Sequence, residues 1–248
     1  MFRRTVDGQI LDFGTTGLLR FSNLVMYDRQ TESWWQEGGG EAVVGDMTGQ
    51  RLELAPLSIV SWKEFKAEYP KGKVLSRATG YKRPYGTNPY VSYDSASAPF
   101  LFHEAVDRRL PALERVVGIS VGKESLAVPY SVLETEPLVH LTLGGHDLVI
   151  FYEKGLSSVL DKESTARGRD VGSAGVFSPY AGSQKLTFHI AEGRVVDDQT
   201  GSSWSLLGIG QTGPLLGVSL RPLVHSPAQF WFSWVVFKPD TLIYRGKS

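Results

Sequence analysis

Apolar and polar residues alternate along most of the chain, in short runs that glycine, aspartate or asparagine separate. Alternation with a period of two is typical of β-strands that bury one face. It predicts strands over residues 9–13, 20–27, 33–36, 51–54, 185–190, 202–206 and 219–223. The pattern therefore indicates a mainly β protein.

Two longer hairpins are predicted in the second half of the chain. Residues 115–128 are expected to turn at Gly122-Lys123, and residues 138–152 at Gly144-Gly145. Two-residue turns that contain glycine are the common connection of antiparallel strands. With these turns, the alternating valine, leucine and isoleucine side chains of each hairpin fall on one face.

Helical signals are confined to two short segments. Ser61 is in position to cap a helix over residues 62–68, which Pro70 would end. Ser226 is in position to cap a second helix, with Pro227 as its first residue and Phe237 near its end. The second segment is apolar on all sides, so we expect it to be buried.

The chain repeats itself at a spacing of 169 residues. The eight residues from Asp28 to Trp35 return as Asp197 to Trp204 with five identities, and Trp62 and Trp231 keep the same spacing. A match at a fixed period indicates a duplicated structural unit. We therefore expect internally duplicated antiparallel β units, sandwich-like or barrel-like, each with one short helix.

The first unit is expected to be incomplete. Residues 1–79 are interpreted as a partial first β unit, residues 80–114 as a connector, and residues 115–248 as a complete second β unit. Nothing in the first unit corresponds to residues 115–176. A unit without those strands is expected to leave a sheet edge open, which favours self-association or pairing with a partner.

Composition excludes several classes of function. The chain has 26 basic and 26 acidic residues, without a block of like charges, which argues against a nucleic-acid partner. It has no cysteine, which excludes disulfides, thiolate metal sites and cysteine nucleophiles. Its five histidines lack metal-ligand spacing, and no apolar run is long enough to span a membrane. No cofactor or metal is predicted.

Two short motifs suggest enzyme chemistry. Gly208-x-Gly210-x-x-Gly213 matches the dinucleotide fingerprint, but Pro214 and Gly217 disfavour the helix that the fingerprint requires. Gly118-x-Ser120-x-Gly122 matches a nucleophile elbow, but a second strand is predicted after it instead of a helix. A triad of Ser120 with His189 or His225 and Asp147, Asp170 or Asp197 would keep the chain order of that motif.

The repeated Asp-x-Gln-Thr segment has two interpretations. It is either a polar ligand site that occurs twice or a structural turn, in which Asp and Thr bond the backbone. We expect a structural turn, because such turns need these residue types without any ligand. The residues are Asp28, Gln30, Thr31, Asp197, Gln199 and Thr200.

Aromatic residues with polar tips mark candidate ligand-binding positions. Three tyrosines and one asparagine come from the connector, and Trp34 is added because it lies next to Trp35 on a strand, so that the two must face opposite ways. The alternative is a clamp that ties the two units together through tyrosine hydroxyl groups. The connector residues are Tyr85, Asn88, Tyr90 and Tyr93.

Four segments resemble one bacterial and archaeal family, the domain of unknown function family number thirty-one seventy-nine. They are Phe-Arg-Arg-x-Val-Asp-Gly, Leu-x-Phe-Gly-x-x-Gly, Met-Tyr-Asp-Arg-Gln-Thr-Glu-Ser and Asn-Pro-Tyr-x-x-Tyr-Asp. In that family a Tyr-Cys-Pro-x-Cys-Gly lead-in precedes the first segment, and this chain starts just after that point. The equivalent place in the second unit, residues 152–156, also lacks cysteine. The resemblance implies an extracytoplasmic home (secreted, periplasmic or cell-surface), because members often carry export signals, but it implies no reaction.

Three functions remain open at the level of sequence. The first is a non-catalytic extracytoplasmic binding or scaffold module, which the all-β repeat and the neutral charge favour. The second is a hydrolase with its site in the groove between the two units. The third is a redox or metal role that depends on the cysteine pair and is lost with it.

Overall fold

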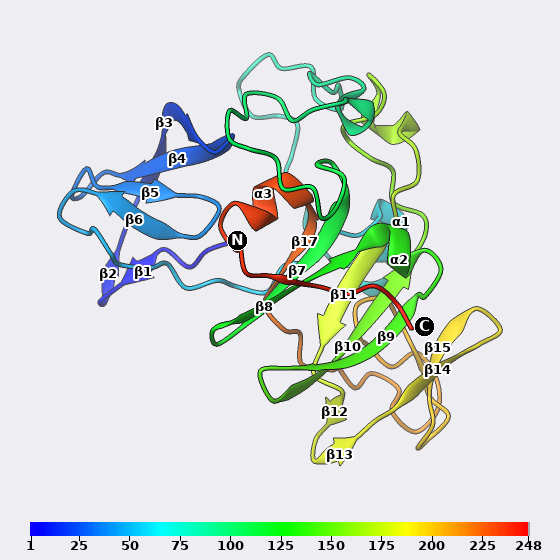
Figure 1. Cartoon of the computed structure of the whole chain (residues 1–248). Coiled ribbons are helices and arrows are strands. Elements are labelled where there is room, and N and C mark those ends of the chain that lie inside the picture. The colour runs from blue at the N-terminus through cyan, green and yellow to red at the C-terminus, as the bar shows by residue number, and fades with distance from the viewer. Residues whose placement is uncertain (248) are drawn as a thin grey trace. The chain divides into compact units, whose positions relative to one another are not determined.

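The structure, a computed structural model, describes residues 1–247 and is mainly β, as the alternation predicts (Figure 1). The chain forms two compact units. Unit 1 contains residues 1–57, 98–129 and 223–245, and unit 2 contains residues 58–97, 130–222 and the last residues from Gly246 on. No helix in the described part of the chain is long and apolar enough to cross a membrane.

Unit 1 contains three sheets and one helix. A two-stranded sheet comprises β1 (Thr5–Val6) and β2 (Gln9–Ile10). The second sheet has the order β3 (Phe13–Arg20), β4 (Asn23–Asp28), β5 (Trp34–Gln36) and β6 (Glu41–Val44). The third has the order β17 (His225–Phe230), β7 (Arg115–Val121), β8 (Glu124–Pro129) and β18 (Leu242–Ile243). The helix is α3 (Trp231–Val235).

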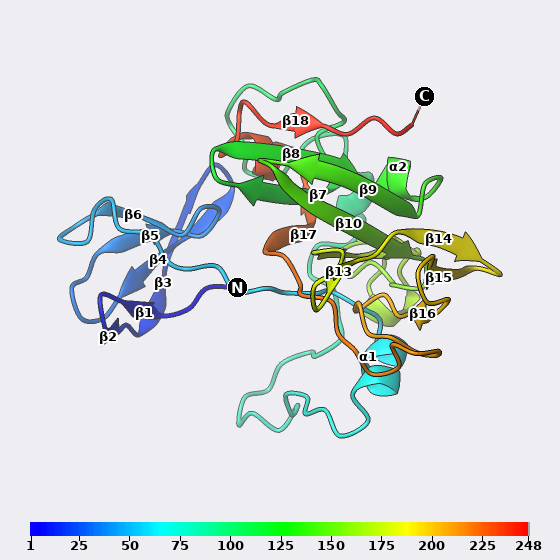
Figure 2. The same cartoon turned by 90° about the horizontal axis from the view of Figure 1, so that it is seen from below.

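The strands of these sheets are antiparallel except for one pair. β18 runs parallel to β8, and Figure 2 shows the two side by side. The predicted hairpin of β7 and β8 is confirmed, with Val121 opposite Glu124 across the Gly122-Lys123 turn. β3 pairs only with β4 among the described residues, so it is an edge strand.

Apolar clusters of described residues stabilise unit 1. Trp35, which is fully buried, packs with Leu11 and Leu52 in the first cluster, whereas Trp34 on the opposite face is 38% exposed. One exposed and one buried tryptophan is the arrangement that strand alternation predicts. Trp231 of α3 packs with Val116 and Ala127 in the second cluster.

The predicted helix from Pro227 to Phe237 is wrong in its first half. Residues 225–230 form strand β17, and the helix begins only at Trp231 with Phe230 as its N-cap. β17 pairs with β7 and contains a bulge between Ser226 and Gln229. The backbone bonds to β7 replace those of a helical turn, so tertiary pairing overrides the local signal of Ser226 and Pro227.

The described residues of unit 2 form three further sheets and two short α-helices. The largest sheet has the order β11 (Ser173–Phe177), β10 (His146–Glu153) and β9 (Leu138–Leu143). The smaller sheets comprise β12 (Tyr180–Ala181) with β13 (Gln184–Lys185), and β14 (Phe188–Ala191), β15 (Arg194–Asp197) and β16 (Ser203–Trp204). The helices are α1 (Trp62–Glu68) and α2 (Tyr130–Leu133), and short 3₁₀ turns occur at Tyr93–Ser95 and Thr165–Arg167.

The core of unit 2 forms where β10 and β11 meet the strands that follow them. Phe151, Phe177, Phe188 and Trp204 pack there with their rings at edge or tilted angles. The hairpin of β9 and β10 has the predicted turn, with Leu143 opposite His146. α1 has the predicted bounds, and a capping box between Ser61 and Glu64 fixes its start.

Two predicted strands are absent as regular strands. Residues 51–54 make only isolated bridges, from Arg51 to Glu41 and from Leu54 to Phe2. Residues 219–223 likewise make isolated bridges at Ser219 and Pro222. Proline lacks a backbone N–H and interrupts a ladder of hydrogen bonds, which explains the short pairing at Pro222.

The compact units differ from the boundaries that the repeat suggests. The connector expected at 80–114 is divided, because its residues up to 97 belong to unit 2 and those from 98 on to unit 1. Residues 58–79, expected in the first unit, also belong to unit 2. The compact units are defined by which segments pack together, whereas the repeat is a similarity of sequence. The packing therefore does not test the division into repeated units, which stays a prediction.

Candidate functional site

The first Asp-x-Gln-Thr segment lies in a turn between β4 and β5. Oδ1 of Asp28 accepts from the backbone N–H of Thr31 at 2.6 Å, and Oδ2 accepts from the indole Nε1 of Trp35 at 2.8 Å. Burial by itself raises the pKa of Asp28, but these hydrogen bonds outweigh it, so the pKa is below its ordinary value. Gln30 accepts from the backbone N–H of Asp12 at 2.9 Å.

The second segment makes the same bonds between β15 and β16. Oδ1 of Asp197 accepts from the backbone N–H of Thr200 at 2.6 Å, and Oδ2 accepts from Nε1 of Trp204 at 3.0 Å. Gln199 accepts from the backbone N–H of Thr187 at 2.9 Å. In both turns the polar side chains are engaged with their own unit.

The glycines of the dinucleotide fingerprint belong to the turn after β16. No helix begins at Gly213, because the next helix, α3, starts only at Trp231 after strand β17, so the phosphate-binding context is missing. Gly213 has φ of +76°, and a Cβ there would lie 2.7 Å from Oγ of Ser202. Gly45 has the equivalent position beside Ser33, because a Cβ on Gly45 would lie 2.6 Å from Oγ of Ser33. The close approach of the turn to a buried serine accounts for these two glycines.

The connector residues lie in unit 2 and are engaged to different degrees. Asn88 is buried, and its side chain donates to the carbonyl of Lys162 at 3.2 Å and accepts from the backbone N–H of Tyr90 at 2.8 Å. The hydroxyl of Tyr85 bonds that of Thr79 at 2.5 Å.

Tyr90 is 58% exposed, and Tyr93 begins a 3₁₀ turn. Trp34 belongs to unit 1. These candidate ligand residues therefore do not form one site within a unit.

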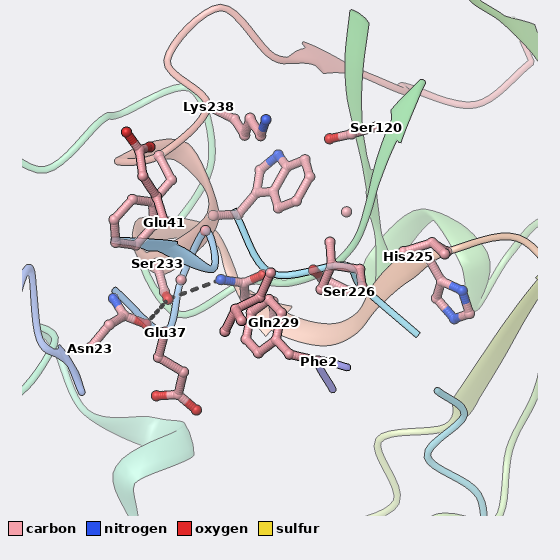
Figure 3. Close-up of a pocket in the computed structure, with 18 of the residues that line it drawn as sticks. Phe2, Asn23, Glu37, Glu41, Ser120, His225, Ser226, Gln229, Ser233 and Lys238 are labelled. Atoms are coloured by element: carbon pink, nitrogen blue, oxygen red, sulfur yellow. Dashed lines mark hydrogen bonds between the residues drawn. The ribbon is translucent and has the colours of Figure 1, made fainter. Parts of the chain in front are cut away.

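A pocket of about 560 Å³ occurs in unit 1 (Figure 3). Its apolar wall includes Phe2, Leu52, Trp234 and Phe237. Ten of its lining residues have polar side chains. They are Asn23, Glu37, Glu41, Arg51, Ser120, His225, Ser226, Gln229, Ser233 and Lys238.

A chain of hydrogen bonds connects three polar side chains of the wall. Nε2 of Gln229 donates to Oγ of Ser233 at 3.0 Å, and that hydroxyl donates to Oδ1 of Asn23 at 2.8 Å (Figure 3). Nδ2 of Asn23 in turn donates to the carbonyl of Phe21 at 2.7 Å. The bonds join β17, α3 and β4, so the orientation of each amide is determined by the fold.

The charged groups of the pocket are of two kinds. Arg51 and Glu41 form an ion pair at 2.6 Å. Glu37 and Lys238 make no ion pair among residues 1–247, and Figure 3 shows them on different sides of the Gln229–Ser233–Asn23 chain. The pocket therefore presents one carboxylate and one ammonium group to an occupant.

Ser120 and His225 both line the pocket but do not form a nucleophile and base pair. Ser226 lies opposite Gly118 and His225 opposite Ile119 across β17 and β7. Directly opposed residues share a face and successive residues alternate, so Ser120 shares the face of Ser226, while His225 points to the other face. In Figure 3 the imidazole of His225 points away from Ser120.

The pocket was not found by sequence reasoning. Its lining comes from residues 1–54, 118–120 and 224–238, which are far apart in the chain. No spacing rule connects these stretches, and only their packing within unit 1 brings them together.

No group of three or more His, Asp or Glu side chains among the described residues is arranged to hold a metal ion. No curated protein and no solved structure matches the chain. The family model described as protein of unknown function (DUF3179) matches residues 1–241 of the 248. The chain therefore belongs to the DUF3179 family.

Proposed function

We propose that this protein is a non-catalytic binding module that works outside the cytoplasm and holds a small polar ligand in the pocket of unit 1. The observation that carries the proposal is the hydrogen-bonded chain of Gln229, Ser233 and Asn23 on the pocket wall. A pocket with a few oriented polar groups beside apolar side chains is typical of ligand sites.

The chemistry of the wall suits a neutral or zwitterionic ligand of sugar or amino-acid size. The hydroxyls of Ser120 and Ser226 and Oε1 of Gln229 have no hydrogen-bond partner among the described residues, so they offer both donors and acceptors. Glu37 and Lys238 add one charge of each sign. A volume of about 560 Å³ is in the range of small-molecule sites.

The absence of a catalytic role is supported by the geometry of Ser120. Acyl transfer by a serine needs a base within hydrogen-bond reach. His225 is on the other face of the sheet, and Ser120 is followed by strand β8 instead of the helix of a nucleophile elbow.

An extracytoplasmic location is supported by the family to which the chain belongs, because members often carry export signals. The absence of cysteine leaves the compartment open, because a chain without thiols suits an oxidising and a reducing environment alike.

We also propose that the two Asp-x-Gln-Thr turns are structural parts of a duplicated β unit, and that β3 is the edge at which a second copy or a partner pairs. The matching bonds of Asp28 and Asp197 support the first point. β3 supports the second, because it has one strand neighbour and exposes Leu18 and Leu19. Light scattering across a concentration series measures the association.

The pocket is tested by calorimetric screening of the full chain against sugars and amino acids. Gln229→Leu is expected to abolish or weaken binding at least tenfold, because it breaks the chain of bonds to Ser233. Gln184→Leu, on an exposed position of unit 2, is the matched control and is expected to bind normally. Equal binding by both variants, or no binding by the native chain, would contradict the proposal.

A further inference from the structure

α1 and its C-cap residue carry three neighbouring aromatic side chains, of which Trp62 and Tyr69 are exposed and Phe65 is half-buried. The rings of Trp62 and Phe65 stack with centroids 5.6 Å apart, and those of Phe65 and Tyr69 lie 5.7 Å apart. The helix buries none of its residues, and Trp62 is 58% exposed. Its counterpart at the spacing of 169, Trp231, is fully buried. The same helical position is therefore core in one copy and surface in the other.

The loop after α1 continues this exposed surface. It has no helix or strand up to residue 92, and Figure 2 shows it as a long loop. Every residue from 71 to 87 is exposed, and Leu75 is completely so. Val74 and Tyr81 are also more than half exposed. Apolar side chains in such a position are commonly part of an interaction surface.

Positive charge is concentrated in the same residues, 62–83, which we call the basic aromatic segment. Seven cationic side chains occur there, all of them exposed, and none forms an ion pair in the part of the chain that the structure describes. They are Lys63, Lys66, Lys71, Lys73, Arg77, Lys82 and Arg83.

The two acidic residues of the segment are engaged in unit 2. Glu64 accepts from the backbone N–H of Ser61 in the capping box, and Glu68 accepts from the side chain of Gln211 at 3.1 Å. The seven cations outnumber these acids by five. Because the chain as a whole has 26 residues of each sign, the remainder has an excess of five acidic residues. The net charge of zero for the whole chain therefore conceals an uneven distribution of charge between this segment and the rest.

We propose that the basic aromatic segment docks on an anionic phospholipid surface. Lysine and arginine near such a surface are attracted by the phosphate headgroups, and exposed tryptophan and tyrosine side chains settle at the level of those headgroups. Val74 and Leu75 favour a bilayer over a nucleic acid, because exposed aliphatic side chains gain free energy by entering hydrocarbon and gain none from the phosphate contacts that dominate nucleic-acid affinity. The combination of exposed aliphatic, aromatic and unpaired cationic side chains favours the bilayer.

Co-sedimentation of the full chain with extruded vesicles tests this docking. Phosphatidylcholine vesicles that contain phosphatidylglycerol are compared with phosphatidylcholine alone. We expect binding to the anionic vesicles and none to the neutral ones, with an affinity that falls as salt is raised. Lys71→Gln with Lys73→Gln is expected to weaken binding about thirtyfold, from the attraction of two surface lysines.

Two further variants separate charge from insertion. Lys123→Gln with Lys154→Gln removes the same charge from exposed positions outside the segment and is expected to leave binding unchanged. Trp62→Ala is expected to weaken vesicle binding without loss of circular dichroism signal, because the side chain is largely exposed.

Four results would overturn the proposal. They are the absence of vesicle binding, equal binding to neutral vesicles, equal loss in the two lysine pairs, and tighter binding to a DNA oligonucleotide than to anionic vesicles at the same salt.

Discussion

Asp28 carries its charge inside the fold because three groups donate hydrogen bonds to it. The backbone and hydroxyl of Thr31 and the indole of Trp35 all bond the carboxylate. These donors would lose their partner if the carboxylate were removed, and a buried donor without a partner costs about 1–3 kcal/mol. The turn and the tryptophan core are thus stabilised by the same side chain.

Replacement of Asp28 by asparagine is expected to lower the free energy of unfolding at neutral pH by about 2 kcal/mol, because an amide NH₂ would face the Trp35 donor. The pKa of Asp28 is lowered in the folded state. Its contribution is therefore fully present above about pH 4, the ordinary range of aspartate, and is lost as the pH falls through the folded-state pKa. Urea unfolding across the pH range measures this.

The exposed Asp240→Asn is the control for this experiment and is expected to change little. A difference between the native chain and Asp28→Asn that stays constant down to strongly acidic pH would show that the charge is not responsible.

α1 and α3 show how similar elements acquire different environments. Both begin with a tryptophan, and the two tryptophans lie 169 residues apart, but α3 is buried along its whole length and α1 buries none of its residues. The sequences agree with this difference, since α1 contains lysine and glutamate while α3 is free of charge. Packing therefore makes α3 part of the core, whereas α1 depends on its capping box.

Truncation of the two tryptophans is expected to have unequal effects. Trp231→Ala should reduce the free energy of unfolding by about 3–5 kcal/mol, because it leaves a cavity in a buried cluster. Trp62→Ala should change it by less than about 0.5 kcal/mol, because the side chain is on the surface. Chemical denaturation of both variants measures the difference, and similar losses would contradict the assigned environments.

The whole molecule combines two well-packed units with one long exposed segment. Residues 71–87 are all exposed and contain most of the cations of the basic aromatic segment. Exposed loops are the first places where a protease can bind an extended chain. The strands of both units, in contrast, are held by ladders of backbone hydrogen bonds.

Limited trypsin digestion is expected to cut first after lysine or arginine within residues 71–83, well before Lys185 or Arg194 in the strands of unit 2. Mass spectrometry of the early fragments identifies the bond. Bound anionic vesicles should slow this cleavage if the segment docks as proposed. First cleavage within a strand would mean that the segment is protected.

More of the fold than of the candidate site could be predicted from the sequence. The alternation, the Gly122-Lys123 and Gly144-Gly145 turns and the cap at Ser61 are visible in the chain and agree with the structure. The candidate site is different, because Gln229 and Asn23 are separated by about two hundred residues and carry no motif. The proposed ligand role of Trp34 and the connector tyrosines stays a prediction.

The sequence by itself determined the features that depend on neighbouring residues, such as the mainly β content, the hairpin turns and the bounds of α1. The reason is that turn geometry, capping and the direction of successive side chains are local. Only the tertiary structure decided that residues 225–230 pair with β7, that Trp231 is buried while Trp62 is exposed, and which residues line the pocket. These features depend on packing between segments far apart in the chain, where the burial of apolar surface and backbone pairing outweigh local preference.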